Sequence, residues 1–253
     1  VDPSRVEQIR ERERRLIERA DLVLVTSKTL LESKGGINPN THWVPNAVDY
    51  ARFAAACEQR SAGESEPADL ADLARPRIGY VGALNDKIDY SLLVRVADTY
   101  PTTPLVLVGP VRVTAQASLD GLQGLRARGN VRFVDQVPVD RVPYYVAACD
   151  VGLLPYRCNA WTANIHPLKM YEYLACGLAV VSTDIPGVRD EADLVQIAAD
   201  EPGFVAAIAR ALDENEPDIR QKRRLRASCN TWRQRVERIS ELIQSTMEAR
   251  GVL

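Results

Sequence analysis

From residue 77 onward, short apolar runs and helical patterns alternate strictly along the chain. The apolar runs lie at 77–82, 105–109, 131–134, 150–154, 178–182 and 194–197. The helical patterns lie near 89–99, 113–128, 139–148, 167–175 and 203–213. This alternation predicts an α/β fold, with a parallel sheet covered by helices on both faces and right-handed crossovers. Ligands of such sheets bind beyond the carboxyl ends of the strands, so we expect candidate site residues in the loops that follow strands.

The two ends of the chain have different patterns. Residues 4–19 are typical of a solvated helix, and a short strand, a short helix and a second short strand follow before residue 50. Residues 54–76 are small, polar and acidic, which predicts a linker with at most a loose helix. Residues 217–250 predict one long amphipathic helix or a pair of helices. Its apolar residues recur at spacings of three or four: Leu225, Cys229, Trp232, Val236, Ile239, Ile243 and Met247.

Composition excludes several classes of protein. The chain of 253 residues is 46% hydrophobic and 26% charged, and its net charge of -2 argues against nucleic-acid binding. Five scattered cysteines without a CxxC spacing argue against a disulfide framework or a zinc site and favour a reducing compartment. No run approaches the roughly 20 apolar residues of a membrane span, and we see no signal peptide. We therefore expect a cytoplasmic protein.

A basic run, "RQKRRLR", opens the C-terminal helical region. It is typical of a solvated helix face. It is also compatible with a weak peripheral contact to anionic lipid headgroups on the inner membrane face.

The stretch "RIGYVGALNDKIDYSLL" places a glycine loop between a strand and a helix. Gly82 would let the backbone approach a ligand closely, the helix start would attract phosphate, and Lys87 could add positive charge. A tight turn from strand to helix would also favour glycine, so both interpretations stay open. A second loop follows the strand at 131–134, where main-chain groups could contact the edge of a base; the neighbouring Tyr144 and Tyr145 are more typical of a core.

The stretch "HPLKMYEYLACGLAVVSTDIPG" carries the strongest local signal. Pro167 suits the first position of a helix, which puts Lys169 in the first turn and Glu172 on the same face. A cation is unfavourable at the positive end of the helix dipole unless an anion offsets it. One interpretation is an ordinary ion pair worth about 0.2–0.5 kcal/mol. The other is a site in which Lys169 contacts a phosphate and Glu172 accepts hydrogen bonds from sugar hydroxyls.

"NIHPLKMYEYLACGLAVVSTDIPGVRDEA" resembles the nucleotide-sugar signature of retaining GT-B glycosyltransferases of group 1, particularly bacterial enzymes of polysaccharide assembly. "ADLVLVTSKTLLES", "HWVPNAVDYARF", "RIGYVGAL" and "VRFVDQVPVDRVPYYVAACDVGLLPY" resemble successive parts of the same family in the same order, and "TWRQRVERI" resembles its closing helix. The resemblance implies two Rossmann-like domains with the active site in the cleft between them. We then expect residues 1–52 to be the last part of an N-terminal acceptor domain and 53–76 a linker. Residues 77–215 would be the nucleotide-sugar-binding domain, followed by the C-terminal amphipathic helix at 216–253.

The resemblance also implies roles for individual residues. Glu172 matches the glutamate that holds the donor ribose, and Lys169 matches a basic residue that contacts the donor diphosphate. Gln136 and Val137 lie in a loop that resembles the segment whose backbone contacts the base. Gly82 belongs to the glycine loop of the same donor site.

This chain departs from the family pattern at two positions. Many members carry a first glutamate that touches the donor sugar eight positions before the second, and Asn164 stands there in this chain. Asparagine can hydrogen-bond a hydroxyl but has no charge, so the identity of the donor sugar stays open. We assign Asn164 and Lys169 to catalysis. Lys87 is the candidate match for a second basic residue that the family often places in the glycine loop. His166 lies in the donor loop, where it could touch a phosphate or sugar oxygen, whereas we expect His42 to be structural.

We therefore expect the chain to supply the donor-binding half of a glycosyltransferase. The donor would be a UDP- or GDP-sugar, the acceptor a glycan or a lipid-linked glycan, and the transfer a retaining hexosyl transfer that needs no metal or other cofactor. An alternative is a non-catalytic nucleotide-sugar-binding module that pairs with a separate acceptor subunit. A nucleotide-sugar epimerase of related fold would need catalytic acids that the sequence does not offer.

Overall fold

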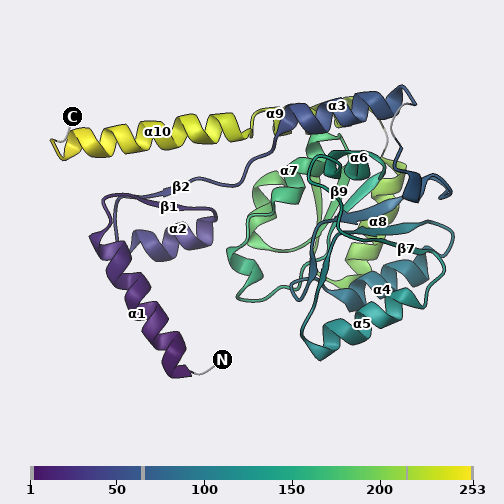
Figure 1. The fold of residues 1–253 in the computed structure, drawn as a ribbon, viewed down its shortest axis with the longest axis horizontal. Helices are drawn as coiled ribbons and strands as arrows, with labels where there is room; N and C mark the ends of the chain where they lie inside the picture. Colours follow the sequence, from purple (N-terminus) through teal and green to yellow (C-terminus); the bar gives the residue numbers. More distant parts are fainter. Residues whose placement is uncertain (1–2, 64–65, 215, 252–253) are drawn as a thin grey trace.

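The computed structural model describes residues 3–63, 66–214 and 216–251. Figure 1 shows two groups of elements: a large sheet covered by helices, and a smaller group formed by the N-terminal segment and the last helix. The chain passes between them twice, once after β2 and once before α10.

The large sheet has six parallel strands in the order β10-β9-β8-β3-β5-β7. The strands are β3 (Ile78–Val81), β5 (Leu105–Val108), β7 (Val131–Val134), β8 (Val151–Leu154), β9 (Ala179–Thr183) and β10 (Val195–Ala198). All six were predicted. The chain runs from β3 outward to β7 and then returns to the other side of β3, so the order reverses between β3 and β8. This is the strand order of a Rossmann-like sheet, and its switch point is where such folds bind ligands.

Helices cover both faces of this sheet, as predicted (Figure 1). One layer contains α4 (Tyr90–Thr99), α5 (Gln116–Arg126) and α8 (Glu201–Asp213). The other contains α3 (Tyr50–Ser61), α6 (Val142–Ala147), α7 (Leu168–Ala175) and α9 (Pro217–Ser228). Shorter elements lie in the connections: β4 (Leu84–Asn85) pairs with β6 (Val111–Arg112), and η1 (Ala68–Leu70), η2 (Thr162–Asn164) and η3 (Pro186–Glu191) are single 3-10 segments. The helix expected from residue 113 starts at Gln116, because the backbone N–H groups of Thr114 and Ala115 donate to Asp86 in a preceding turn.

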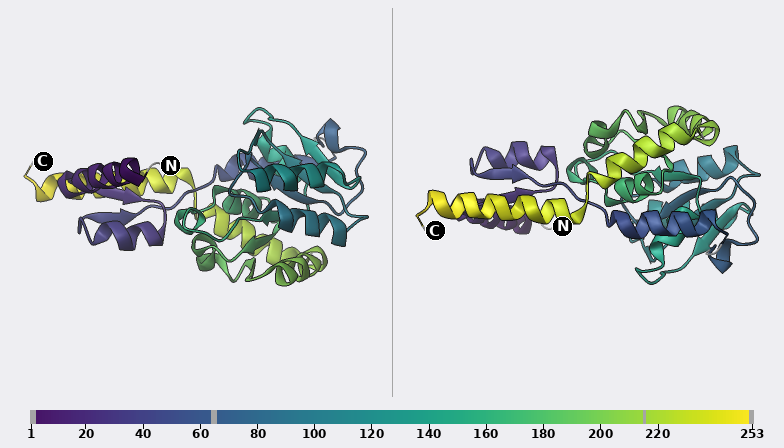
Figure 2. Two further views of the ribbon diagram at one scale, coloured as in Figure 1. Left: turned by 90° about the horizontal axis from the view of Figure 1, so that it is seen from below. Right: turned by 90° about the horizontal axis from the view of Figure 1, so that it is seen from above.

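The N-terminal segment has the four elements that its sequence predicts. They are α1 (Pro3–Arg19), β1 (Val23–Val25), α2 (Lys28–Gly35) and β2 (Thr41–Trp43), and the two strands pair in parallel. The last helix, α10 (Trp232–Ala249), lies beside this segment (Figure 2). Asn40 Nδ2 donates to Thr246 Oγ1 at 3.2 Å, and Arg235 Nε donates to the Pro45 carbonyl at 3.0 Å. Contacts distant in sequence therefore hold α10 against the N-terminal segment.

The prediction of at most a loose helix within residues 54–76 was wrong. Residues Tyr50–Ser61 form the regular helix α3, which packs against α6 and α7. Phe53, Ala56 and Cys57 are buried at the spacing of one helix face. Alanines obscured this pattern in the sequence, because they give the segment the composition of a linker. The helix is nevertheless packed against the fold through Phe53, Ala56 and Cys57.

The C-terminal region is a pair of helices, and its predicted apolar stripe does not form a buried face. The chain breaks between α9 and α10, where Thr231 and Gln234 form a reciprocal capping box. The break changes the helical phase, so apolar residues counted across it point in different directions. Four members of the predicted stripe are exposed: Leu225, Trp232, Val236 and Ile243.

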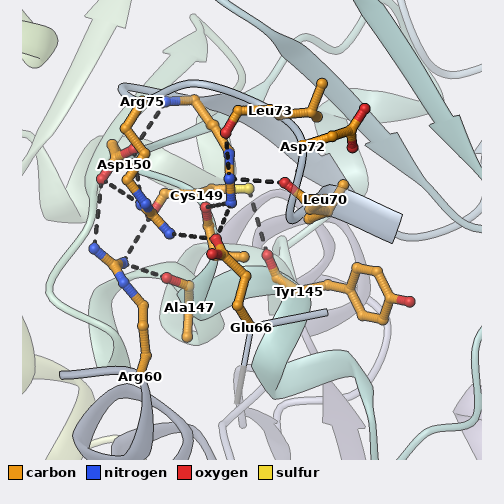
Figure 3. Close-up of polar contacts among 12 residues, drawn as sticks. Arg60, Glu66, Leu70, Asp72, Leu73, Arg75, Tyr145, Ala147, Cys149 and Asp150 are labelled. Atoms are coloured by element: carbon orange, nitrogen blue, oxygen red, sulfur yellow. Dashed lines mark hydrogen bonds and ion pairs between the residues drawn. The ribbon is translucent and has the colours of Figure 1, made fainter. Parts of the chain in front are cut away.

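The buried Arg77 fixes residues 66–76 to the amino end of the sheet. Figure 3 shows four of its partners, Glu66, Leu70, Leu73 and Asp150, gathered at this end. The guanidinium of Arg77 donates to the carbonyls of Leu70 at 2.8 Å and Leu73 at 2.5 Å, and it pairs with Glu66. Asp150, just before β8, accepts the backbone N–H of Arg77 at 2.8 Å. These bonds lie at the opposite edge from the carboxyl ends of the strands. They fix the relative position of β3 and β8, the two strands that flank the switch point.

Candidate functional site

The glycine loop at the end of β3 is shaped by a side chain from α7. Gly82 has a φ of +144°, and a Cβ at this position would overlap Cε and Nζ of Lys169. Gly109, which follows the neighbouring strand β5, has a φ of +131°, and a Cβ there would overlap the Gly82 carbonyl. Glycine is therefore needed here for close approach as well as for backbone conformation. The structure brings Gly82 and Lys169 together, although 87 positions separate them in the sequence.

Helix α7 begins one residue later than expected and holds Lys169 at its second position. Pro167 has the extended conformation of a cap, with φ −71° and ψ 112°, and the helix starts at Leu168. The half-buried side chain of Lys169 extends toward β3, where its Nζ lies 5.5 Å from the centroid of the Tyr80 ring. Burial lowers the pKa of Lys169, and the charge of Glu172 opposes this shift.

Lys87 comes from the loop between β4 and α4 and adds a second cation to the site. Its Nζ lies 4.9 Å from the centroid of the Tyr156 ring. Burial lowers the pKa of Lys87 to about 8, and the positive charge of Lys169 contributes to the same shift. Among the described residues, neither lysine forms an ion pair with a carboxylate. Two neighbouring ammonium groups without a counter-ion form an environment that favours a bound anion.

Glu172 lies one turn beyond Lys169 on α7. Burial raises its pKa, while the charge of Lys169 acts in the opposite direction. Within the part of the chain that the structure describes, the Glu172 carboxylate has no hydrogen-bond donor and forms no ion pair with Lys169. The interpretation of these two residues as an ordinary surface ion pair was therefore wrong. A half-buried carboxylate without a partner is a candidate acceptor for ligand hydroxyl groups.

Asn164 lies in the loop between β8 and α7, on the single 3-10 turn η2. The loop is held internally by Asn159 Oδ1, which accepts the backbone N–H groups of Trp161 at 2.9 Å and Thr162 at 3.1 Å. Asn164 Nδ2 donates to the Ala160 carbonyl at 2.8 Å. Its Oδ1 has no partner among residues 3–63, 66–214 and 216–251. The local bond thus orients the amide and leaves its oxygen as a free acceptor.

The remaining sequence-predicted residues lie at two other places. Gln136 is exposed and Val137 half-buried in the loop after β7. In the sheet, β7 lies two strands from β3, so these two strands are about 10 Å apart. His166 is not part of the lysine cluster, because its buried ring lies between Trp43 and Tyr171, with ring centroids at 6.4 and 5.6 Å. His42 contacts Asn40 through its ring Nε2 at 2.8 Å.

Sequence reasoning missed two residues that support Lys87. Arg157, just after β8, donates its backbone N–H to the Lys87 carbonyl at 2.8 Å and its Nε to the Ile88 carbonyl at 3.2 Å. Asp86 accepts the Thr114 hydroxyl at 2.7 Å and backbone N–H groups of Thr114 and Ala115, and these bonds lower its pKa to about 2. Both residues follow strands, which is the signal that could have identified them.

The described residues include no group of three or more His, Cys, Asp or Glu side chains placed to hold a metal ion. In the same part of the chain, no helix combines the length and apolar character needed to cross a membrane.

Comparisons with known proteins identify the family and the fold of the chain. The family described as "Glycosyl transferases group 1" matches residues 75–214, which is more than half of the chain. A putative teichuronic acid biosynthesis glycosyltransferase of Bacillus subtilis, TuaH, is 27% identical over 235 residues, which cover 88% of this chain and 57% of that protein. The chain thus spans little more than half the length of this relative.

Solved structures share the fold. Sucrose-phosphate synthase from Thermosynechococcus elongatus superposes with a TM-score of 0.71 at 23% identity, covering 94% of this chain and 61% of that one. HepE from Anabaena, solved in complex with UDP, has a TM-score of 0.71 at 18% identity, covering 91% of this chain and 65% of that one. Because the family match includes all six strands of the Rossmann-like sheet and more than half of the chain, the chain belongs to the glycosyl transferases group 1 family, and it has a GT-B glycosyltransferase fold.

Proposed function

We propose that this chain is the donor-binding half of a glycosyltransferase that transfers a hexose from a nucleoside diphosphate sugar to a glycan or lipid-linked acceptor. The observation that carries the proposal is the pair Lys87 and Lys169. The two cations are partly buried, have lowered pKa values and lack a carboxylate partner in the described part of the chain. Such a pair is destabilising by itself and becomes favourable when a diphosphate lies between the ammonium groups.

The neighbouring groups fit the rest of such a donor. Glu172 accepts hydrogen bonds from the ribose hydroxyls, and the loop at Gln136 contacts the base with its main chain. Asn164 Oδ1 accepts a hydroxyl of the transferred sugar. When the sugar leaves, negative charge develops on the diphosphate, and Lys87 and Lys169 stabilise that charge without a metal ion. We expect transfer with retention of the anomeric configuration, as in the family that the sequence resembles.

The direct test is isothermal titration calorimetry with UDP and with GDP. We expect the wild-type chain to bind one of them, and Lys169→Ala to weaken that binding about 10- to 100-fold, the loss typical of a hydrogen bond to a charged group. Lys222→Ala is the matched control, because Lys222 is an exposed lysine on α9 and its removal changes the net charge equally. The proposal fails if neither nucleotide binds wild type at millimolar concentration, or if the two variants lose affinity equally.

Glu172 provides a test of how the nucleotide is oriented. We expect wild type to prefer UDP over 2′-deoxy-UDP about tenfold, because the deoxy compound leaves the carboxylate without one of its donors. Glu172→Gln should reduce this preference to less than threefold while it retains binding of the diphosphate. Equal preferences in wild type and variant, measured by the same titration, would place the ribose elsewhere.

The lowered pKa of Lys87 predicts a dependence of affinity on pH. Free Lys87 loses its proton near pH 8, and a bound diphosphate favours the charged form and raises the pKa. Nucleotide affinity should therefore fall about tenfold from pH 7 to pH 9, and binding at pH 8.5 should take up a proton. Proton uptake is measured from the dependence of the binding enthalpy on the buffer. Lys87→Arg stays charged at this position, so both effects should be smaller than in wild type, and what remains would come from Lys169, whose pKa is also lowered. A flat profile in wild type would contradict the assignment.

A further inference from the structure

Two side chains of the N-terminal segment contact the loop that carries Asn164, and a third pairs with η3. Thr29 Oγ1, in the first turn of α2, donates to the Ala163 carbonyl at 3.0 Å. Asn46 Nδ2, after β2, donates to the His166 carbonyl at 2.7 Å. Lys28 Nζ lies 2.6 Å from Asp190 Oδ1, but both side chains are about half exposed, so this ion pair contributes little. The two partly buried hydrogen bonds are the specific part of the contact.

The two accepting carbonyls lie on either side of Asn164. Ala163 precedes it directly, and His166 follows two residues later. The turn η2 is only three residues long, and such a short 3-10 segment has little stability of its own. Its conformation therefore depends on side chains that bond its backbone. Asn159 does so from within the loop, and Thr29 and Asn46 do so from the N-terminal segment.

The contact is extended by the packing of His166. Its ring lies between Trp43 of β2 and Tyr171 of α7, and its Nδ1 is buried without a hydrogen-bond partner in the described chain. Burial and the nearby charge of Arg235 lower the pKa of His166 to about 4, so the ring is neutral near pH 7. The buried, neutral ring therefore adds packing between β2 and the loop to the hydrogen bond that Asn46 makes.

We propose that Thr29 and Asn46 are positioning residues for recognition of the transferred sugar. They do not touch the donor. By holding the carbonyls on both sides of Asn164, they keep the free Oδ1 of Asn164 in the orientation that meets a sugar hydroxyl. The N-terminal segment thereby affects binding of the sugar part of the donor, while binding of the nucleotide depends on Lys87 and Lys169. This inference rests on the proposed function.

The test compares affinities for the nucleoside diphosphate that wild type binds and for its glucose conjugate. Thr29→Val keeps the shape of the side chain and removes the donor, and Asn46→Ala removes the second donor. We expect each to weaken binding of the sugar nucleotide about fivefold, as for the loss of one hydrogen bond, and to change nucleoside diphosphate affinity less than twofold. Thr29→Ser should restore the wild-type ratio. Ser33→Ala is the control on the same helix, because among the described residues the Ser33 hydroxyl bonds only the local Leu30 carbonyl.

A second measurement is independent of any ligand. The backbone N–H groups of Ala163, Asn164 and Ile165 donate to carbonyls within the loop, and we expect them to exchange hydrogen about fivefold faster in Thr29→Val than in wild type or Ser33→Ala. Unchanged exchange would overturn the inference. So would an unchanged affinity ratio in a chain that binds the nucleoside diphosphate, and the proposed function would then stand. Absence of any nucleotide binding in wild type would instead overturn the proposed function.

Discussion

The approach of Lys169 to the glycine at the end of β3 is the contact on which the candidate site depends. It requires a residue without a Cβ at position 82, because a side chain there would occupy the space of the lysine head group. It also requires α7 to begin beside β3, which follows from the reversal of strand order between β3 and β8. Lys87 then lies close enough for its charge to interact with that of Lys169. The fold thus places two like charges together at the edge of the sheet where this class of fold binds ligands.

Such an arrangement reduces the stability of the free protein, and this is informative about function. The pKa values of both lysines are lowered mainly by burial, so their charged forms are less favourable in the folded chain than in the unfolded one. The charge of Glu172 compensates only in part, since the carboxylate forms no ion pair with Lys169 among the described residues. Functional sites are where such unfavourable groups are retained, because the ligand supplies the missing partner.

Much of the fold and part of the site could be predicted from the sequence. The six buried strands of the large sheet were identified because parallel strands are continuous apolar runs. Lys169 was identified because a cation in the first turn of a helix is unfavourable beside the positive end of the helix dipole. This can be recognised from one short stretch of sequence. The helix α3 was missed because its buried positions are separated by alanines. The prediction of one apolar stripe across α9 and α10 was wrong because a capping box at Thr231 starts a new helix there.

The contacts of the donor loop could not be predicted in the same way. Thr29 and Asn46 bond carbonyls that lie more than a hundred positions further along the chain, and carbonyls have no sequence signature. The close contact of Lys169 with Gly82 likewise depends on the three-dimensional arrangement. Residues that act through the backbone of another segment become visible only when the structure brings the segments together.

The central claim is that Lys87 and Lys169 are held together for an anion at the expense of stability. The most direct measurement is the thermal midpoint of wild type and of the double variant Lys87→Met, Lys169→Met at pH 7, with and without UDP and GDP. This pH lies below the lowered pKa of Lys87, so the full cost of its charge is present. We expect the double variant to melt at a higher temperature than wild type, and nucleotide to raise the midpoint of wild type alone. A double variant that melts at a lower temperature and is still stabilised by nucleotide would contradict it.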